Sequence, residues 1–177
     1  GHSTPINDIF WSDMVAHELG HQFGARHTFN GNRGSCSSNF DPLGSFEPGA
    51  GSTIMGYGLS PFCGLDGLQG ANGAGALKDP YFHSNSIEEM IAHTTGGSPG
   101  DLGRSDTGNS EPVANAGLDA SIPAPTPFML VGIGNDPDGA ASLTYNWEQR
   151  DLGAQRALDN PQITAGPLFR SQLPSSV

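Results

Sequence analysis

The chain has 177 residues, including 26 Gly and 14 Pro, and it carries 18 Asp and Glu against 7 Lys and Arg, a formal net charge of −11. Because binding to nucleic acids or anionic membranes requires clustered Lys and Arg, this charge argues against both partners. No apolar run of about 18 residues is present, so we expect no membrane insertion, and the first residues lack the pattern of a signal peptide.

The first predicted element is a helix that begins at Ser12 or Asp13, because either side chain can cap a helix N-terminus. Its apolar stripe, at helical spacing, consists of Met14, Val15, Leu19 and Phe23. The periodicity stops at Gly24, a residue that readily adopts the left-handed conformation of a helix exit. We therefore expect the helix to end at Gln22 or Phe23.

Residues 28–80 are predicted to form mainly loop, because Gly, Ser, Asn and Pro interrupt every helical period there. The two cysteines of the chain, Cys36 and Cys63, both lie in this stretch. A disulfide between them would restrict the unfolded chain by about 3 to 4 kcal/mol in the chain-entropy model, and we favour this pairing. Two reduced structural thiols are the alternative.

A second helix is predicted from Ser86 to about His93. Ser86 and Glu89 are three residues apart and form a capping-box pattern. The apolar face of this helix consists of Ile87, Met90 and Ile91. Residues 96–112 are rich in Gly, Ser, Asp and Asn and contain almost nothing apolar, which is typical of a linker.

Beyond the linker the apolar residues alternate with others, which is typical of half-buried strands. This pattern predicts strands in residues 127–133 and 142–149 and a short strand near residues 162–165. The sequence therefore predicts two modules, residues 1–95 and 113–177, on either side of the linker.

Three histidines with metal-ligand spacing lie in and after the first predicted helix. His17 and His21 are four residues apart, so their imidazoles project from one helix face and can reach one metal ion. His27 follows six residues later, and the exit at Gly24 would let the chain turn back toward the ion. Three imidazoles leave one coordination position for water, as in catalytic zinc sites. Glu18 lies beside the first ligand and could act on that water.

Two alternatives to a catalytic zinc site stay open. The helix could be an ordinary amphipathic helix with histidines on its surface. The site could also be a structural zinc site, which requires a fourth protein ligand. The residues available for that ligand are Cys36, Cys63, His83 and His93.

The motif in residues 17–27 resembles the extended zinc signature of the metzincin metalloendopeptidases. The zinc ligands that this resemblance implies are His17, His21 and His27. It also implies that Glu18 is the general base. In metzincins a methionine-containing turn follows the third histidine and closes beneath the metal. Residues 52–57, with Met55, match this Met-turn.

Within this clan the chain is most similar to secreted bacterial reprolysin-like peptidases. The shared order is a Cys-containing loop, the Met55 turn, a second Cys and a segment like residues 79–87 before the last helix. This similarity implies a secreted or extracellular location, with the periplasm as the alternative. Thr28 departs from the pattern, because many reprolysins carry Asp there.

Tyr57 lies two residues after Met55. Astacin-like and serralysin-like members place a tyrosine there that can ligate zinc or stabilise the transition state, and plain packing is the alternative role. Metzincin catalytic domains also have a substantial upper half before the zinc helix, whereas only about ten residues precede that helix here. The resemblance therefore implies an α+β lower catalytic subdomain with two helices, long loops and a Met-turn.

The second module resembles a PKD or related immunoglobulin-like domain, which implies a partial β-sandwich. Residues 112–117 are similar to its opening strand, and residues 135–139 and 143–147 to its turn and central strand. Asp136 and Asp138 could bind calcium, although a plain turn accounts for them more simply.

Together these patterns predict a zinc-dependent endopeptidase that hydrolyses internal peptide bonds, with a protein or peptide as its substrate. The alternative is a non-catalytic fragment, or an extracellular binding or adhesion module, that retains a zinc site. Nothing in the sequence indicates an oligomeric state.

Overall fold

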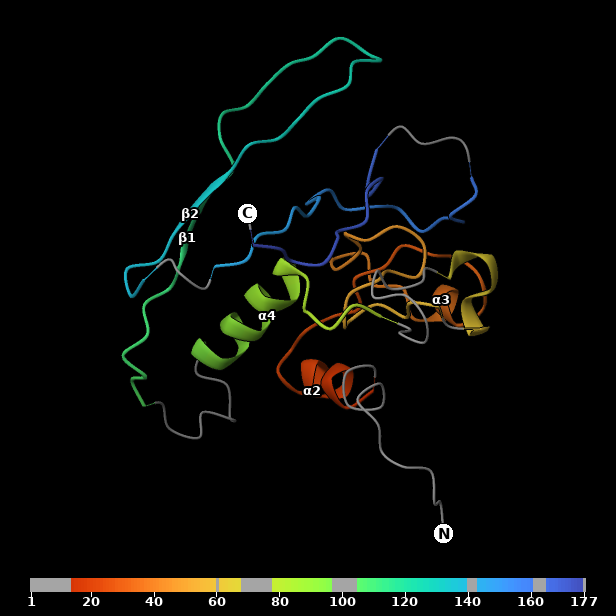
Figure 1. The fold of residues 1–177 in the computed structure, drawn as a ribbon. Helices are drawn as coiled ribbons and strands as arrows, with labels where there is room; N and C mark the ends of the chain where they lie inside the picture. Colours follow the sequence, from red (N-terminus) through yellow and green to blue (C-terminus); the bar gives the residue numbers. More distant parts are fainter. Residues whose placement is uncertain are drawn as a thin grey trace. The chain divides into compact units, whose positions relative to one another are not determined.

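The computed structural model describes residues 14–59, 61–67, 78–96, 105–139, 143–160 and 165–176. The elements in these ranges are the helices α2 (Ala16–Gln22), α3 (Gly34–Ser38), η2 (Pro61–Asp66, a 3₁₀ helix) and α4 (Ser84–Thr95), and the strands β1 (Val113–Asn115) and β2 (Ile133–Asn135) (Figure 1). This mixture of helices and a small sheet is compatible with the predicted α+β class. No helix in the described ranges has both the length and the apolar character needed to cross a membrane.

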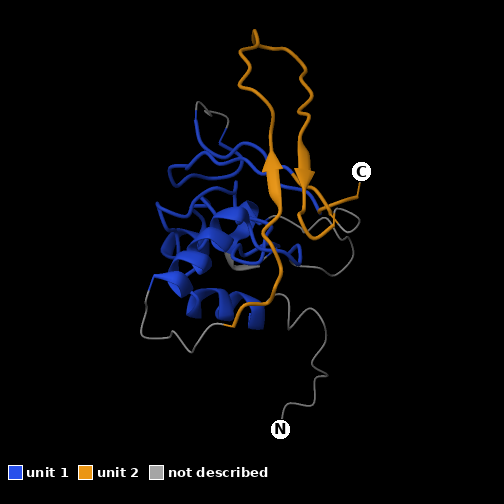
Figure 2. Ribbon diagram, turned by 90° about the vertical axis from the view of Figure 1, so that its left-hand side faces the viewer, with its two compact units in different colours: residues 1–102, 147–173 blue, residues 103–146, 174–177 orange. Residues whose placement is uncertain are grey.

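The chain divides into two compact units (Figure 2). Unit 1 contains residues 1–102 and 147–173, and unit 2 contains residues 103–146 and 174–177. This division differs from the predicted modules over residues 147–173, which the strand pattern assigns to the second module. The predicted module boundaries themselves stay a prediction.

Helix α2 ends where the sequence predicts. The N–H groups of Phe23 and Gly24 donate to carbonyls of the last turn, and Gly24 has a φ of 90°, the left-handed exit expected of it. A Cβ at Gly24 would lie 2.9 Å from Cβ of His93. Both this close contact and the positive φ therefore disfavour any residue larger than glycine at this position. Ser12 and Asp13, the predicted caps, lie outside the described residues.

The buried face of α2 is not the predicted apolar stripe. Within the described part of the chain Met14 and Leu19 are half or more exposed, whereas His17 and Gly20 are buried. A Cβ at Gly20 would lie 2.4 Å from Sδ of Met55, so α2 contacts the core through its small residue. Periodicity alone misplaced this face, because the glycine adds no hydrophobicity to the pattern.

Helix α4 begins at Ser84, two residues before the predicted start, and ends at Thr95. The side chain of His83 caps it, since its Nδ1 accepts a hydrogen bond from the N–H of Asn85 at 3.2 Å. The predicted capping box is wrong, because Ser86 lies inside the helix and is buried. Glu89 instead accepts a hydrogen bond from the N–H of Arg26 at 2.8 Å.

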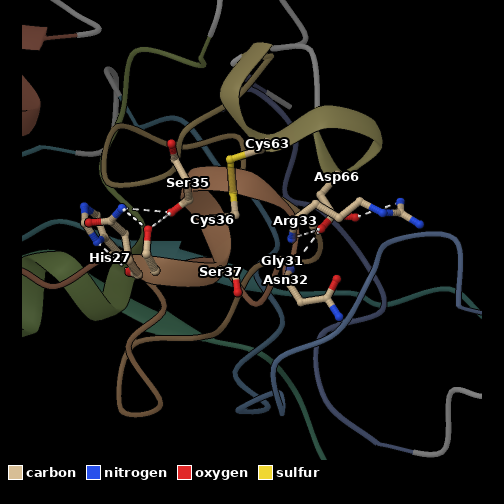
Figure 3. Close-up of a disulfide and its surroundings, with 12 residues drawn as sticks. His27, Gly31, Asn32, Arg33, Ser35, Cys36, Ser37, Cys63 and Asp66 are labelled. Atoms are coloured by element: carbon tan, nitrogen blue, oxygen red, sulfur yellow. Dashed lines mark hydrogen bonds and ion pairs between the residues drawn. A yellow bond between two sulfur atoms is a disulfide. The ribbon is translucent and has the colours of Figure 1, made fainter.

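The predicted loop between these helices contains two short helices joined by a disulfide (Figure 3). Cys36 in α3 is bonded to Cys63 in η2, as favoured from the sequence, and the two helices pack together. Both sulfurs lie in a small core with Phe29 and Ala50, against which Tyr57 packs. Propensity does not predict such short helices, because their stability depends on this packing rather than on their length.

A second small core lies between α2 and α4. It contains Ala25, Ile54 and Met55, with Phe82 and Met90 packed against it. The turn that carries Ile54 and Met55 is therefore held in the interior of unit 1.

Strands β1 and β2 form an antiparallel pair in unit 2, with Val113 opposite Asn135. Strand β1 lies within the predicted opening strand, residues 112–117. The predicted strand at residues 127–133 is formed only at its last residue, and within the described part of residues 142–149 a single bridge occurs, at Tyr145. The prediction at residues 162–165 lies, apart from residue 165, outside the described residues.

Polar contacts join residues 147–173 to the rest of unit 1. Arg170 forms an ion pair with the fully buried Asp79 at 2.9 Å, and Ser171 shares a hydrogen bond with the hydroxyl of Tyr81. Gly153 and Ser45 exchange two hydrogen bonds of 2.9 and 2.7 Å. These contacts explain why the segment groups with unit 1 and not with the strands that precede it.

Replacing Arg170 with Ala should lower the free energy of unfolding by about 3 kcal/mol, because the buried Asp79 carboxylate loses its guanidinium partner. The matched control is Glu88→Ala, which breaks the exposed Arg150–Glu88 ion pair and should cost less than about 1 kcal/mol. Urea unfolding followed by circular dichroism measures both. If Arg170→Ala lowered the free energy of unfolding as little as Glu88→Ala, the contacts of residues 147–173 would contribute little to the stability of unit 1.

Candidate metal centre

The structure brings together the three histidines of the sequence motif. His17 and His21 lie one turn apart on α2, and His27 returns toward them after Gly24. Their candidate ligand atoms all lie within 4.8 Å of one another. Nε2 of His21 and Nε2 of His27 are 3.1 Å apart.

Each of these rings is held by a backbone carbonyl through its other nitrogen. Nδ1 of His17 lies 2.7 Å from the oxygen of Ile54, and Nδ1 of His21 lies 2.8 Å from that of Ala25. Nδ1 of His27 lies 2.8 Å from the oxygen of Asn39, at the end of α3.

These three contacts set the tautomer of every ring. A carbonyl oxygen can only accept a hydrogen bond, so these contacts favour a proton on Nδ1 and a lone pair on Nε2 of each neutral imidazole. At His17 the Ile54 oxygen at 2.7 Å is closer to Nδ1 than Nζ of Lys78, which lies 3.4 Å away. Metal-binding histidines in proteins are oriented in this way, with the outer N–H donated to a carbonyl or carboxylate. This arrangement leaves a lone pair on Nε2 of each ring, and the candidate ligand atoms of the three rings lie close enough together to share one ion.

The environment favours the neutral form of two of the candidate ligands, His17 and His27. Burial, and then the nearby Lys78 ammonium, lower the pKa of His17 to about 3. Nζ of Lys78 donates to the same Ile54 oxygen at 3.0 Å. Burial also lowers the pKa of His27. Because a protonated imidazole cannot bind a cation, these shifts keep the site ready for metal at neutral pH.

The donor set fits zinc with an open coordination position. Three neutral imidazoles are a known ligand set of catalytic zinc, and within the described residues the cluster consists of these histidines alone. Cys36 and Cys63 are joined in the disulfide, and among the described residues the cluster of candidate ligand atoms does not include His83. The structural-zinc alternative therefore finds none of these three side chains available as a fourth ligand.

The predicted catalytic residues lie beside the triad. Glu18 is on α2 next to His17, and its side chain is exposed to solvent. The Tyr57 ring centroid lies 4.9 Å from that of His27 and 4.7 Å from that of Phe29. Burial, and then the Glu18 charge, raise the pKa of Tyr57, so its hydroxyl keeps its proton at neutral pH.

Met55 lies beneath the site, fully buried against Gly20 of α2. The residue before it, Ile54, supplies the carbonyl that orients His17. The turn of residues 52–57 thus contacts α2 by packing and by a hydrogen bond to a candidate ligand.

The sequence did not reveal the groups that orient the rings. The carbonyls of Ile54, Ala25 and Asn39 belong to residues of three different types, and no side-chain pattern marks a backbone oxygen. Lys78 carried one weak signal, as the only lysine of the chain.

A model of metallo-peptidase family M12, Reprolysin_5, matches residues 7–66. The matched range contains the three histidines, Glu18 and the Met55 turn. Together, the match and the triad suggest a zinc metallopeptidase, and a peptidase family implies protein or peptide substrates. No curated protein and no solved structure gave a match to the chain.

Replacing His17 with Ala should abolish stoichiometric zinc binding, because two imidazoles without the third hold the ion far more weakly. The matched control is His93→Ala, an exposed histidine on α4 that lies outside the triad. Elemental analysis after dialysis against trace zinc measures the metal in both variants. Equal zinc content in the two would refute the triad as the metal site.

Proposed function

We propose that this chain provides the zinc centre of a secreted, reprolysin-like metzincin endopeptidase that hydrolyses internal peptide bonds of proteins. The observation that carries the proposal is the convergence of three carbonyl-oriented Nε2 atoms beside the Glu18 carboxylate. The M12 family match supports the peptidase class. The packing of Met55 under α2 supports the metzincin type, with residues 52–57 as its Met-turn. The disulfide supports an oxidising compartment.

In this proposal His17, His21 and His27 hold the zinc ion through Nε2. When bound, zinc would polarise the scissile carbonyl and lower the pKa of a water molecule toward about 7. Glu18 accepts the proton from the attacking water and later delivers it to the leaving amine. Its exposed position on α2 gives it access to both water and substrate.

Tyr57 is proposed to stabilise the developing oxyanion. Its raised pKa keeps the hydroxyl as a donor, and its ring is fixed by contacts with His27 and Phe29. A fixed donor near the reacting carbonyl contributes to catalysis without a reorganisation cost.

Replacing Glu18 with Gln should leave zinc bound and abolish turnover, because an amide of the same shape cannot accept the proton. A quenched-fluorescence peptide library and elemental analysis measure both properties on the same sample. The matched control is Glu88→Gln, an exposed glutamate on α4, which should keep the activity of the parent chain. Full hydrolysis by the Glu18 variant would exclude the assigned base. A wild-type chain that binds zinc and cleaves no peptide would favour the alternative of a binding module that retains a zinc site.

Replacing Tyr57 with Phe should lower kcat by about 10²-fold while KM and zinc content change little, since a single oxyanion donor is lost. Steady-state kinetics on one peptide substrate tests this. Unchanged kcat would assign Tyr57 to packing alone.

A further inference from the structure

Glu47 is a buried carboxylate whose bonds reach both sides of the metal centre. Its exposed fraction is 2%. Its Oε1 accepts hydrogen bonds from the N–H groups of Ser52 at 2.8 Å and Thr53 at 3.1 Å. Its Oε2 accepts hydrogen bonds from the hydroxyls of Thr28 and Thr53. These donors are all neutral, and they hold the Glu47 side chain in the interior by hydrogen bonds.

The backbone of Glu47 adds to the same connection. Its N–H donates to the carbonyl of Thr28 at 2.7 Å, and its own carbonyl accepts from the N–H of Asn30 at 3.0 Å. The segment that follows His27 is therefore fixed to Glu47 through main chain and side chain together.

Glu47 connects residues that adjoin the supports of two different candidate ligands, His17 and His27. Thr28 directly follows His27, and Thr53 directly precedes Ile54, whose carbonyl accepts the hydrogen bond from Nδ1 of His17. Burial of an ionised carboxylate is costly unless several hydrogen bonds compensate it. The chain places this carboxylate where it fixes the spacing between the supports of His17 and His27.

We propose that Glu47 is a positioning residue of the metal centre. It ties the segment after His27 to the turn before Met55 and so holds the Nε2 atoms of His17 and His27 at the separation that one ion requires. This inference rests on the proposed function, because it assigns a role within the same site.

Two substitutions of Glu47 distinguish the effect of its hydrogen bonds from the effect of its charge. Glu47→Ala removes all of the side-chain bonds. Glu47→Gln keeps them, because the amide oxygen can accept the two N–H groups while the amide NH₂ donates to the hydroxyls of Thr28 and Thr53, which can also accept. A positioning role predicts that Gln rescues what Ala loses.

The test uses the full chain and the metal ions alone. Zinc affinity is measured by competition with a chromophoric chelator, and coordination geometry by the visible spectrum of the Co²⁺-loaded chain. For Glu47→Ala we expect zinc affinity to fall about 10- to 100-fold, as with other residues that orient ligands, together with a changed Co²⁺ spectrum. For Glu47→Gln we expect the affinity and spectrum of the parent chain.

Glu148 supplies a control for lost stability. Its side chain is 10% exposed and accepts a hydrogen bond from the N–H of Ser84 at 2.7 Å, and Ser84 adjoins neither a candidate ligand nor the carbonyl of one. Glu148→Ala should lower the melting temperature and leave the Co²⁺ spectrum unchanged. If Glu47→Ala does not fold, Thr28→Val replaces it, since this variant removes one link and keeps the side-chain shape. Thr28→Val should weaken zinc binding in the same direction.

The proposal would be overturned if folded Glu47→Ala or Thr28→Val kept the zinc affinity and Co²⁺ spectrum of the parent chain. An equal spectral change in Glu148→Ala would overturn it as well. NMR of the metal-free chain tests the role of Glu47 separately from the proposed function. The Nδ1 protons of His17 and His27 should give slowly exchanging NMR signals in the metal-free parent chain and in Glu47→Gln, and these signals should be lost in Glu47→Ala. A parent chain that binds no metal refutes the proposed function, whereas these proton signals decide the role of Glu47 on their own.

Discussion

The metal centre depends on one constraint, that three neutral imidazoles must present their Nε2 lone pairs to a common point. A free histidine ring can carry its proton on either nitrogen and can rotate. Here the carbonyls of Ile54, Ala25 and Asn39 accept the outer N–H of each ring and remove both freedoms. The rest of unit 1 can be understood from the need to place those three oxygens.

Each oxygen is supplied by a different structural device. The left-handed exit at Gly24 brings the Ala25 carbonyl back over the end of α2. The short helix α3, joined to η2 by the disulfide, ends at the Asn39 carbonyl. The interior turn packed on Gly20 supplies the Ile54 carbonyl. Small apolar cores and buried acids satisfied by backbone N–H groups hold these loops, so long Gly-rich segments can serve as a rigid support.

Local features of the fold could be predicted from the sequence, and the features that depend on tertiary contacts could not. Histidine spacing, the exit at Gly24 and the Cys36–Cys63 disulfide follow from helix geometry, backbone freedom and cysteine count. The buried face of α2 could not be predicted, because it is defined by a glycine against Met55. The assignment of residues 147–173 to unit 1 rests on polar contacts such as Arg170 with Asp79, which carry no periodic signal.

X-ray absorption at the zinc K-edge of the zinc-loaded chain tests the central claim most directly. The account predicts a first shell of nitrogen and oxygen at about 2.0 to 2.1 Å, the outer-shell scattering of three imidazoles and no sulfur. A shell containing sulfur at about 2.3 Å, or scattering from fewer than three imidazoles, would contradict it.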